Sequence, residues 1–552
     1  MPQKTKHKKT TMQPPIEIPD QSLSELFYSV SKKNKDKQAL FFKGKFKTYA
    51  ELEEEVNRFS NSLQKLGIKK GDRIAVLLPN CPQFVTIFFA VQSLGAIFTA
   101  FNPMYSAREI KNRLNDSKPK IFITLNLFLE KIKSIEQDIS VNHIIITSVA
   151  RELPFPTKHI YKLITLGKNI PLEKSKNYSI LLKEGANKRI KTKINPEDDI
   201  AILQYTGGTT GKPKGAMLTH KNLIAQTAVL QYWLTKMDKQ PKGQKKVAGV
   251  LPYSHIFGLT SSFLWPISLG ATTYLVPDPR KLEEVMEIID NHGIHFLNCV
   301  PVFFQKFATH KNLHKYDLSS LYLSISGGES LPKETVNVFE KNAKSLLIEG
   351  YGLTEAAPVT HINPPTKSGR KIGSIGVTIP NTKAKIVNTE TREEIKTPNA
   401  SGELLIKGPS VMKGYWNNKE ETEASFQNGW LRTGDVATQD DKGYFTIIDR
   451  LKDMIIVSGY KVWPNEVEEI LLTHPNILEA AVVGIKTKIG TKLKATIVKK
   501  EGKEKITLDE MRAYCKEFLA PYKVPRVLEY RDELPRSSVG KVLRRELRVD
   551  AT

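Results

Sequence analysis

The stretch QYTGGTTGKPKGAMLTH, residues 204–220, mixes glycines with hydroxyl side chains and then places Lys212 and Lys214 on either side of a proline. Glycines let a backbone approach a ligand closely, while hydroxyl and ammonium groups suit phosphate oxygens. The common P-loop, G-x-x-x-x-G-K-[ST], does not fit. It would need a glycine at 206 and a hydroxyl residue at 213, where the chain has Thr206 and Pro213. The stretch therefore predicts a phosphate-binding loop of another kind.

The apolar run AILQYT (201–206) directly precedes this loop and predicts a buried strand. Strands that alternate with helices indicate α/β layers with largely parallel sheets, in which ligands bind beyond the carboxyl ends of strands. Two later runs, 321–326 and 345–350, also predict strands and end in the glycine-rich turns SGGES (326–330) and EGYGLTEA (349–356). We therefore expect three loops to converge on one cleft. The remaining predicted strands are 73–79, 120–124, 143–147 and 247–252.

The pattern changes beyond residue 370. KAKIVN, GELLIKG and GYFTIID are short alternating strands with turn residues between them, which predicts a β-subdomain. DRLKDMI (449–455) then leads into a charged segment of about 100 residues, long enough for a small independent α+β domain. No internal repeat of fixed period is present.

Length and charge set the class of protein. With 552 residues the chain exceeds one core, so two or more domains are expected. Its 83 Lys and Arg against 58 Asp and Glu give a net charge of +25, which raises the local concentration of anions. The lysines are spread along the chain, and no nucleic-acid-binding motif accompanies them. We therefore favour a solvated, lysine-rich surface and expect no nucleic-acid partner.

The cysteines and the two ends indicate the compartment. Only Cys81, Cys299 and Cys515 occur, too few and too widely spaced for a disulfide framework or a Cys-rich metal site. The start, MPQKTKHKKTTMQPP, is basic and polar and predicts a disordered tail rather than a secretory signal. The end, LRVDAT, carries no organelle address. These features predict a cytoplasmic protein.

One run tests the expectation that no membrane is crossed. FVTIFFAVQSLGAIFTAF (84–101) has 18 residues without a charge, the threshold for a spanning helix. Gln92, Ser93 and Gly95 interrupt it. A buried helix to about Leu94, followed by a strand at 96–101, explains these residues better.

The segment 205–215 resembles the signature of the adenylate-forming superfamily, which includes acyl-CoA synthetases, peptide-synthetase adenylation domains and beetle luciferases. Four further segments follow in the family's order and at family-like spacing: GYGLTE (350–355), TGD (433–435), DRLKDMIIVSGYKVWPNEVEE (449–469) and PRSSVGK (535–541). The resemblance implies two half-reactions with ATP and CoA as co-substrates. ATP and a carboxylate first give an acyl-adenylate and pyrophosphate, and a thiol then takes the acyl group.

The resemblance also implies an architecture. We expect an α/β protein with a large N-terminal region of two α/β layered subdomains plus a β-subdomain, and a small mobile α+β C-terminal domain. The expected boundaries are residues 1–18 for the disordered basic tail, 19–448 for the N-terminal AMP-binding domain, 449–453 for a hinge and 454–552 for the C-terminal domain.

For the nucleotide, the resemblance implies that Asp435 accepts hydrogen bonds from the ribose and that Arg450 supports the ribose or a phosphate. Tyr351 would stack on the adenine beside the 326–330 turn. An Asx-turn residue, an inter-domain salt bridge and a core tyrosine are the respective alternatives. The full set of implied nucleotide contacts is Thr206, Gly207, Gly208, Thr209, Thr210, Gly211, Lys214, Gly328, Glu329, Gly350, Tyr351, Gly352, Asp435, Ile447 and Arg450.

For the first half-reaction, the main need is to neutralise charge that develops on phosphate oxygens. By resemblance, Glu355 and Thr206 would hold Mg²⁺, a hard cation suited to oxygen ligands. Thr354 would donate to the α-phosphate, and Lys541 would bridge the carboxylate and the α-phosphate. His255, in PYSHIFG, matches a histidine that lies near the acyl group or gates it; a core histidine is the alternative.

For the second half-reaction, the resemblance implies a turn of the C-terminal domain. Lys452 matches the family's hinge, where a few dihedral angles carry the motion. Gly459, in SGYKVW, would line the tunnel for the pantetheine arm of CoA, where a side chain would obstruct the thiol.

The substrate is set by the pocket rather than the fold. Amino-acid-activating relatives carry an aspartate in the counterpart of SHIFG, and no acid occurs between Leu251 and Leu264 here. The motifs resemble those of medium- and long-chain fatty acyl-CoA synthetases most, so we expect an acid–thiol ligase that activates a fatty acid. The apolar residues near the expected pocket suit an alkyl chain or are simply core: Trp233, Phe257, Phe263, Phe303 and Phe304.

Alternatives remain open at this point. The enzyme could take an aryl or short-chain acid, or pass acyl-AMP to a carrier protein, or be a non-enzymatic polyanion- or membrane-binding scaffold. Peripheral membrane association and a homodimer are also left open. Two departures from the family pattern are a shortened, acid-free loop at 484–495 and Lys461 in place of a frequent asparagine.

Overall fold

The computed structural model describes residues 13–157, 159, 161, 170–206, 214–457, 460–487, 490–537 and 540–548. Most of the predicted basic tail, Gly459 and seven residues of the predicted phosphate loop (207–213) lie outside them. These seven include the predicted nucleotide contacts Gly207, Gly208, Thr209, Thr210 and Gly211. By its contacts the chain forms two compact units. One is Met12–Lys383 with Lys407–Gly429, and the other contains Ala384–Ile406 and Trp430–Thr552. The predicted boundary at residues 449–453 stays a prediction.

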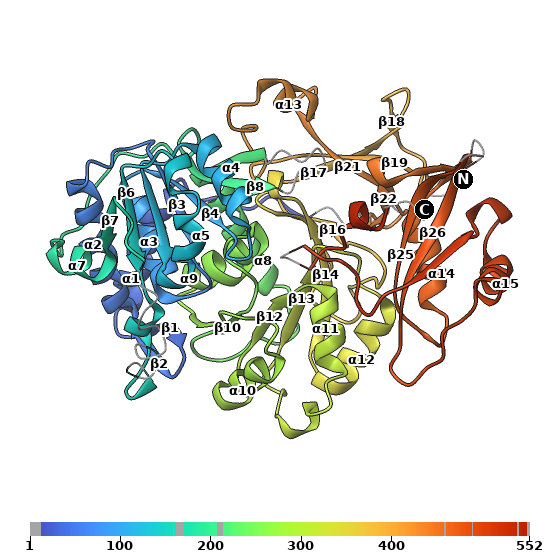
Figure 1. Cartoon of the computed structure of the whole chain (residues 1–552), viewed down its shortest axis with the longest axis horizontal. Helices are drawn as coiled ribbons and strands as arrows, with labels where there is room; N and C mark the ends of the chain where they lie inside the picture. Colours follow the sequence, from blue (N-terminus) through green and yellow to red (C-terminus); the bar gives the residue numbers. More distant parts are fainter. Residues whose placement is uncertain are drawn as a thin grey trace, which may run out of the picture. The chain divides into compact units, whose positions relative to one another are not determined.

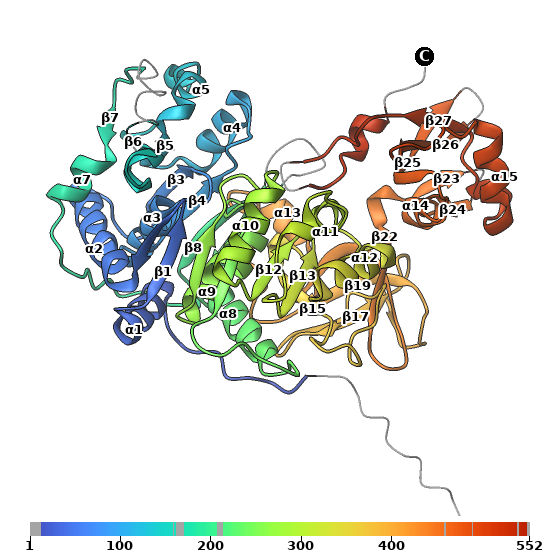
Figure 2. The ribbon, with the colours of Figure 1, turned by 90° about the horizontal axis from the view of Figure 1, so that it is seen from below.

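The first unit contains a seven-stranded sheet in the order β7-β6-β5-β3-β4-β8-β9. Its strands are parallel except for β9, which runs antiparallel to β8. The helices α1 (Leu23–Asn34), α2 (Tyr49–Lys65) and α3 (Pro82–Ser93) pack against one another beside it (Figure 2). The strand bounds are β3 Arg73–Leu77, β4 Ile97–Phe101, β5 Ile121–Leu125, β6 His143–Thr147, β7 Ser175–Asn177, β8 Ile200–Thr206 and β9 Lys214–Thr219.

The uncharged run 84–101 divides as predicted. The fully buried α3 ends at Ser93, its C-cap Leu94 and Gly95 (φ +63°) turn the chain, and β4 follows at Ile97. Glycine suits Gly95 because its φ lies in the left-handed region. Within the described ranges, no helix combines the length and apolar character needed to cross a bilayer.

A second sheet of nine strands has the order β16-β15-β14-β13-β12-β10-β11-β1-β2. Its middle is parallel, whereas β2, β15 and β16 are antiparallel to their neighbours. The helices α10 (Leu282–His292), α11 (Pro301–Ala308) and α12 (Lys333–Ala343) lie along it (Figure 1). The strand bounds are β1 Gln38–Phe42, β2 Lys45–Thr48, β10 Lys246–Gly249, β11 Thr272–Leu275, β12 Phe296–Cys299, β13 Leu323–Gly327, β14 Leu346–Gly352, β15 Val359–Ile362 and β16 Val377–Thr378.

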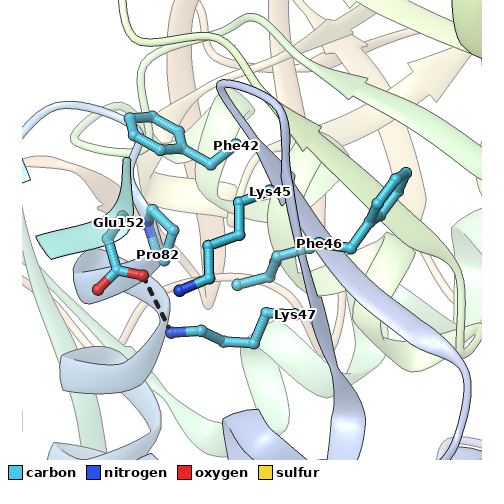
Figure 3. Close-up of a pocket in the computed structure, with 7 residues that line it drawn as sticks. Phe42, Lys45, Phe46, Lys47, Pro82 and Glu152 are labelled. Carbon is cyan, nitrogen blue, oxygen red and sulfur yellow. Dashed lines mark hydrogen bonds and ion pairs between the residues drawn. The ribbon is translucent and has the colours of Figure 1, made fainter. Parts of the chain in front are cut away.

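A buried cluster of charges joins three elements of this unit. Lys47 on β2 lies 2.6 Å from Glu55 on α2 and 3.3 Å from Glu152 in the turn η3 (Val149–Glu152). Arg151 lies 2.7 Å from Glu55, which balances the two carboxylates with two cations. Burial opposes the charge of Lys47, but the carboxylates of Glu152 and Glu55 hold its pKa above its usual value. Figure 3 shows Lys47 facing Glu152 in a small cavity rimmed by Phe42 and Phe46.

In the second unit, β17 (Lys383–Val387), β19 (Gly402–Lys407), β21 (Trp430–Gln439) and β22 (Phe445–Arg450) form an antiparallel sheet, with β18 (Glu394–Ile395) at its edge. The chain continues through β23 (Ile455–Val457), β24 (Tyr460–Val462) and α14 (Pro464–Leu472). The sheet β25-β26-β27 (Ile477–Thr487, Gly490–Lys499, Val527–Tyr530) lies beside α14 and α15 (Leu508–Phe518) (Figure 2). Together they enclose a core around Val467, Leu493 and Met511.

The expectation of a loop at 484–495 is wrong. Residues on both sides of its centre pair in register, from Gly484 with Leu493 to Thr487 with Gly490. The lysines alternate with Ile, Thr and Leu, and an alternation with period two suits a strand that is buried on one face. The segment is therefore a β-hairpin, β25–β26.

The predicted mixed α/β class is confirmed. The two layered sheets, the antiparallel β-subdomain and the small C-terminal α+β part all occur as expected. Further helices are α4 Ala107–Ser117, α5 Leu129–Lys133, α7 Tyr178–Glu184, α8 His220–Leu234, α9 Trp265–Ser268 and α13 Lys419–Ala424.

Candidate active site

The predicted phosphate loop connects two hydrogen-bonded strands. β8 ends at Thr206 and β9 begins at Lys214, and these two residues are partners in the antiparallel register. The hydroxyl of Thr206 lies 3.5 Å from the carbonyl of Lys214. Because β8 belongs to the parallel part of its sheet, its end is where ligands bind in such folds. The structure thus fixes both ends of the loop at the expected edge.

The two glycine-rich segments lie at the ends of neighbouring strands, although β14 runs to Gly352 and so includes the first half of the predicted turn 349–356. β13 and β14 are parallel, with Gly327 opposite Gly350. Gly328 has a φ of +95°, which disfavours any other residue. A Cβ on Gly352 would lie 2.0 Å from the carbonyl oxygen of Pro358, so only glycine fits there. The turn after β13 carries Gly328 and Glu329, and the end of β14 carries Gly350, Tyr351 and Gly352, so these predicted nucleotide contacts lie on neighbouring strands.

Thr354 and Glu355 form a short 3-10 turn after β14, η6 (Thr354–Ala356). The carboxylate of Glu355 accepts a hydrogen bond of 2.6 Å from the hydroxyl of Tyr415. The backbone carbonyl of Glu355 accepts another, of 2.8 Å, from the amide of Met412. Burial and the charge of Glu355 raise the pKa of Tyr415. The phenol therefore stays protonated and donates a hydrogen bond to the Glu355 carboxylate.

Tyr415 also connects Glu355 to Lys214. The ammonium of Lys214 lies 5.6 Å from the centroid of the Tyr415 ring and forms an ion pair with Glu421. The segment around Tyr415 pairs with β9: the amide of Trp416 donates to Gly215 (2.8 Å). Two predicted site residues, Lys214 and Glu355, therefore share one tyrosine between them.

Sequence reasoning missed Tyr415 and Glu421. Both lie in KGYWNNKEE (413–421), some 60 residues beyond Glu355, and nothing local marks them as partners of the phosphate loop. The available signal was an aromatic pair next to a glycine between two strands, which is also common in ordinary turns.

The predicted acyl-side histidine lies close to these turns. His255 is half-buried, and its Nδ1 accepts a hydrogen bond from the amide of Phe257 (3.3 Å). A Cβ on Gly327 would lie 3.2 Å from the Phe257 ring, so the PYSHIFG segment packs on the end of β13.

Tyr351 is half-buried and lies 5.8 Å, between ring centroids, from His361. Burial lowers the pKa of His361 to about 3, so this histidine is neutral at physiological pH. The ring of Tyr351 is thus backed by an uncharged aromatic neighbour, as a stacking surface for a base would be.

The aromatic residues proposed for an acyl pocket lie in the core. Phe303 and Phe304 pack at 5.8 Å from one another, and Phe304 packs against Phe339 of α12. Phe263 stacks on Tyr253, and the indole of Trp233 donates to the carbonyl of Asn363 (3.0 Å). These contacts are those of core residues, which is the second of the two interpretations that the sequence left open.

Two further predicted residues form an ion pair in the second unit. Asp435 on β21 and Arg450 on β22 are register partners, with 3.3 Å between Oδ1 and Nε. Asp435 is buried and Arg450 is exposed. Ile447 lies on the same strand as Arg450, opposite Ala437. The β21–β22 hairpin therefore presents a fixed carboxylate next to a cation.

The hinge and the late lysine belong to the same unit. Lys452 lies in the turn η7 (Leu451–Asp453), where burial and the charge of Arg450 lower its pKa. Lys541 is half-buried: its carbonyl accepts from the amide of Ser537 (2.7 Å), and its amide donates to the Ser537 hydroxyl (3.1 Å).

The oxygen donors fit the expected magnesium ion. In the part of the chain that the structure describes, no group of three or more His, Cys, Asp or Glu side chains is placed to hold a metal. Mg²⁺ commonly uses one or two protein carboxylates and takes its other ligands from water and substrate phosphates. The single carboxylate of Glu355, with the hydroxyl of Thr206, is consistent with that use.

The chain matches the family model of AMP-binding enzymes over residues 27–416, and that of the AMP-binding enzyme C-terminal domain over residues 466–541. The first match alone covers more than half of the chain. The protein belongs to the AMP-binding enzymes, and the resemblance inferred from its motifs is confirmed.

Particular relatives span nearly the whole chain. It is 40% identical to a long-chain-fatty-acid–CoA ligase of Bacillus subtilis over 544 residues, covering 97% of this chain and 96% of the relative. It is 37% identical to a long-chain-fatty-acid–CoA ligase of Escherichia coli O6:H1 over 551 residues, with the same coverage. Among solved structures, the anthranilate CoA ligase AuaEII in complex with anthranoyl-AMP is similar, with a TM-score of 0.84, 25% identity and 97% of each chain covered.

Proposed function

We propose that this protein is an AMP-forming acid–thiol ligase that activates a medium- or long-chain fatty acid as its adenylate and transfers the acyl group to CoA. The observation that carries the proposal is the full-length similarity, at 40% identity, to a long-chain-fatty-acid–CoA ligase. The ends of β8 and β9 that carry Thr206 and Lys214, and the turn η6 that carries Glu355, support it, because they offer hydroxyl, ammonium and carboxylate groups to a nucleoside triphosphate.

In the first half-reaction, the fatty carboxylate attacks the α-phosphorus of ATP and pyrophosphate leaves. Thr354 donates a hydrogen bond to the α-phosphate, and Lys541 supplies positive charge where the attacking oxygen meets it. Such preorganised charge is usually the largest contribution to this kind of catalysis. A magnesium ion bound by Glu355 and Thr206 would supply further charge neutralisation, and Tyr415 orients the Glu355 carboxylate.

The remaining residues bind and orient the substrates. Asp435 would accept hydrogen bonds from the ribose, with Arg450 beside it, and Tyr351 would stack on the adenine. His255 would lie near the acyl group. Lys452 would be the hinge residue, and Gly459 would line the passage of the CoA thiol. We also infer a cytoplasmic location, which the three buried, unpaired cysteines support.

Pyrophosphate release tests the proposal across a series of straight-chain acids from acetate to stearate, with benzoate as the aryl member, with and without CoA. We expect CoA-dependent acyl-CoA formation from the longer fatty acids. Activity with benzoate alone would favour an aryl substrate, to which the similarity with an anthranilate CoA ligase draws attention. Adenylate without any CoA product would favour transfer to a carrier protein.

A further inference from the structure

Ion pairs of two arginines, one before and one after Lys541 in the sequence, fix the segment that carries this lysine. The segment 535–543 folds back on itself. The amide of Leu543 donates to the carbonyl of Pro535 (2.7 Å), and the backbones of Arg536 and Val542 form an antiparallel β-bridge. We call this segment the Lys541 hairpin. Its flanking residues Leu534 and Leu547 are buried in one small apolar cluster with residues of β25. Apolar packing alone, however, leaves the direction of the hairpin adjustable.

An ion pair anchors the first side of the hairpin. Arg536 lies 2.9 Å from Glu479 of β25 and also donates to the carbonyl of Gly540 (2.6 Å), next to Lys541. This arginine therefore ties the tip of the hairpin to a strand of the C-terminal sheet.

A second anchor leaves the other side. Nη2 of Arg544 lies 2.7 Å from a carboxylate oxygen of Glu468 and 2.8 Å from the amide oxygen of Asn465, both on α14. Glu468 is itself fixed, because it accepts from the amide of Val482 on β25 (2.7 Å). A guanidinium that meets two acceptors at once defines direction as well as distance.

The second anchor continues to the strand that carries Arg450. The backbone amide of Asn465 donates to Asp449 (2.9 Å), and its side-chain amide donates to the carbonyl of Ile448 (3.2 Å). Both acceptors lie at the end of β22, directly before Arg450. A continuous series of hydrogen bonds thus runs from the Lys541 hairpin through Arg544 and Asn465 to β22.

We propose that Arg544 is a positioning residue of the first half-reaction, which fixes the Lys541 hairpin to α14 and, through Asn465, to the strand that carries Arg450. The inference rests on the proposed function, in which Lys541 acts in adenylation and not in thioester formation. A positioning error of about 1 Å can lower a rate by about 100-fold, so loss of this anchor should affect that half-reaction selectively.

The test uses the full-length protein in three forms. Arg544→Lys keeps the charge but loses the two-acceptor geometry, and Arg544→Met with Glu468→Gln removes the anchor without leaving a buried carboxylate unpaired. The matched control is Lys494→Met with Glu529→Gln, another ion pair of this unit (2.5 Å) that joins β26 to β27. Each form is assayed for ATP–pyrophosphate exchange with palmitate and for single-turnover reaction of preformed palmitoyl-adenylate with CoA.

We expect exchange to fall by about 10- to 100-fold in both Arg544 forms while the CoA step stays within about threefold, and the control to keep both. Equal loss of the two steps, or unchanged exchange in a folded variant, would overturn the assignment. If the double variant does not fold, the same ratio in Arg544→Lys decides.

Hydrogen exchange gives a readout that does not depend on activity. Peptides that cover the Lys541 hairpin should exchange about tenfold faster in the Arg544 variants, with β25 and β26 unchanged, because local opening governs their protection. Unchanged protection of the hairpin contradicts the proposal. Failure of the wild type to exchange pyrophosphate with any acid would instead refute the proposed function. Hydrogen exchange of the Lys541 hairpin in the wild type and the Arg544 variants would still test whether Arg544 fixes the hairpin.

Discussion

At the scale of single residues, the hydroxyl of Tyr415 is the most informative group in the candidate site. It contacts Glu355 directly, and its ring lies beside the ammonium of Lys214. Without that hydroxyl, the Glu355 carboxylate would lose the hydrogen bond that the buried phenol donates to it. The consequence should appear in how strongly the enzyme depends on magnesium.

We expect Tyr415→Phe to lower kcat/KM for ATP by about tenfold and to raise the magnesium concentration needed for half-maximal rate, because partners that orient metal ligands commonly contribute that much. Initial rates of adenylation across a MgCl₂ series measure both effects. Tyr322→Phe serves as the control, because this tyrosine is 38% exposed and its ring contacts His295. A Tyr415→Phe enzyme with the wild-type magnesium dependence would contradict the assigned role.

Glu349, the residue before the GYG turn, has an unusual titration. Burial raises the pKa of its carboxyl from 4.5 to about 8, against a hydrogen bond from the amide of Leu331 that lowers it. In the folded protein the group stays protonated up to about pH 8, while in the unfolded chain it ionises above pH 4.5. The unfolded state therefore binds fewer protons in this window, and stability falls as pH rises through it.

Glu349→Gln removes this proton-linked cost, because an amide does not ionise. We expect the variant to gain stability relative to wild type between pH 5 and pH 8, by at most about 4–5 kcal/mol from the size of the shift. Thermal unfolding at the two pH values measures the difference, with the exposed Glu334→Gln as control. A variant whose advantage is the same at both pH values would show that Glu349 is not the group responsible.

At the scale of elements, the charge cluster around Lys47 connects β2, α2 and η3. Its four side chains lie between 2.6 and 3.3 Å from their partners, and Lys47 and Glu152 are both buried. Removal of one partner from a buried pair is costly, since it leaves an uncompensated charge out of water.

Lys47→Met should therefore reduce the free energy of unfolding of this unit by about 3–5 kcal/mol. Lys43→Met, at the neighbouring turn, removes an exposed lysine paired with Glu284 and should cost less than about 1 kcal/mol. Urea unfolding followed by intrinsic fluorescence compares the two. Equal effects would mean that the cluster contributes no more than a surface pair.

The elements that position the site were predictable because their signals are local. Short apolar runs ending in glycine-rich turns predicted β8, β13 and β14 near their observed bounds, and the breakers in 84–101 predicted the end of α3. The partnership of Glu355 with Tyr415 was not predictable, because it joins segments about 60 residues apart that each look like ordinary turns. The β25–β26 hairpin was also not predicted: residues 484–495 were expected to form a loop, although their lysines alternate with Ile, Thr and Leu.

At the scale of the whole molecule, two half-reactions have to share one chain. The structure groups the strands between Ala384 and Ile406, and those from Trp430 onward, with the C-terminal residues. The sequence pattern instead changes beyond residue 370, and the family resemblance implies a hinge at residues 449–453. Which strands group by contact depends on long-range packing, and a single sequence without that packing gives only the change in local pattern.

Lys541→Ala tests the division of labour between the half-reactions. We expect adenylation to fall by at least about 100-fold, because a charge aimed at the transition state is lost. The reaction of preformed acyl-adenylate with CoA should remain within a few-fold of wild type. Rapid-quench measurements of each step separate the two, and a parallel decline would refute a role confined to the first.

The hydrogen bonds that Asn465 makes to Ile448 and Asp449 cross the five residues proposed as the hinge. If the chain turns there once per catalytic cycle, both hydrogen bonds must break, their groups must bind water, and the bonds must then form again. The turnover rate would then carry an activation enthalpy that belongs to this one asparagine. Enzymes adapted to cold or heat could adjust their speed at this position without altering any group that touches a substrate.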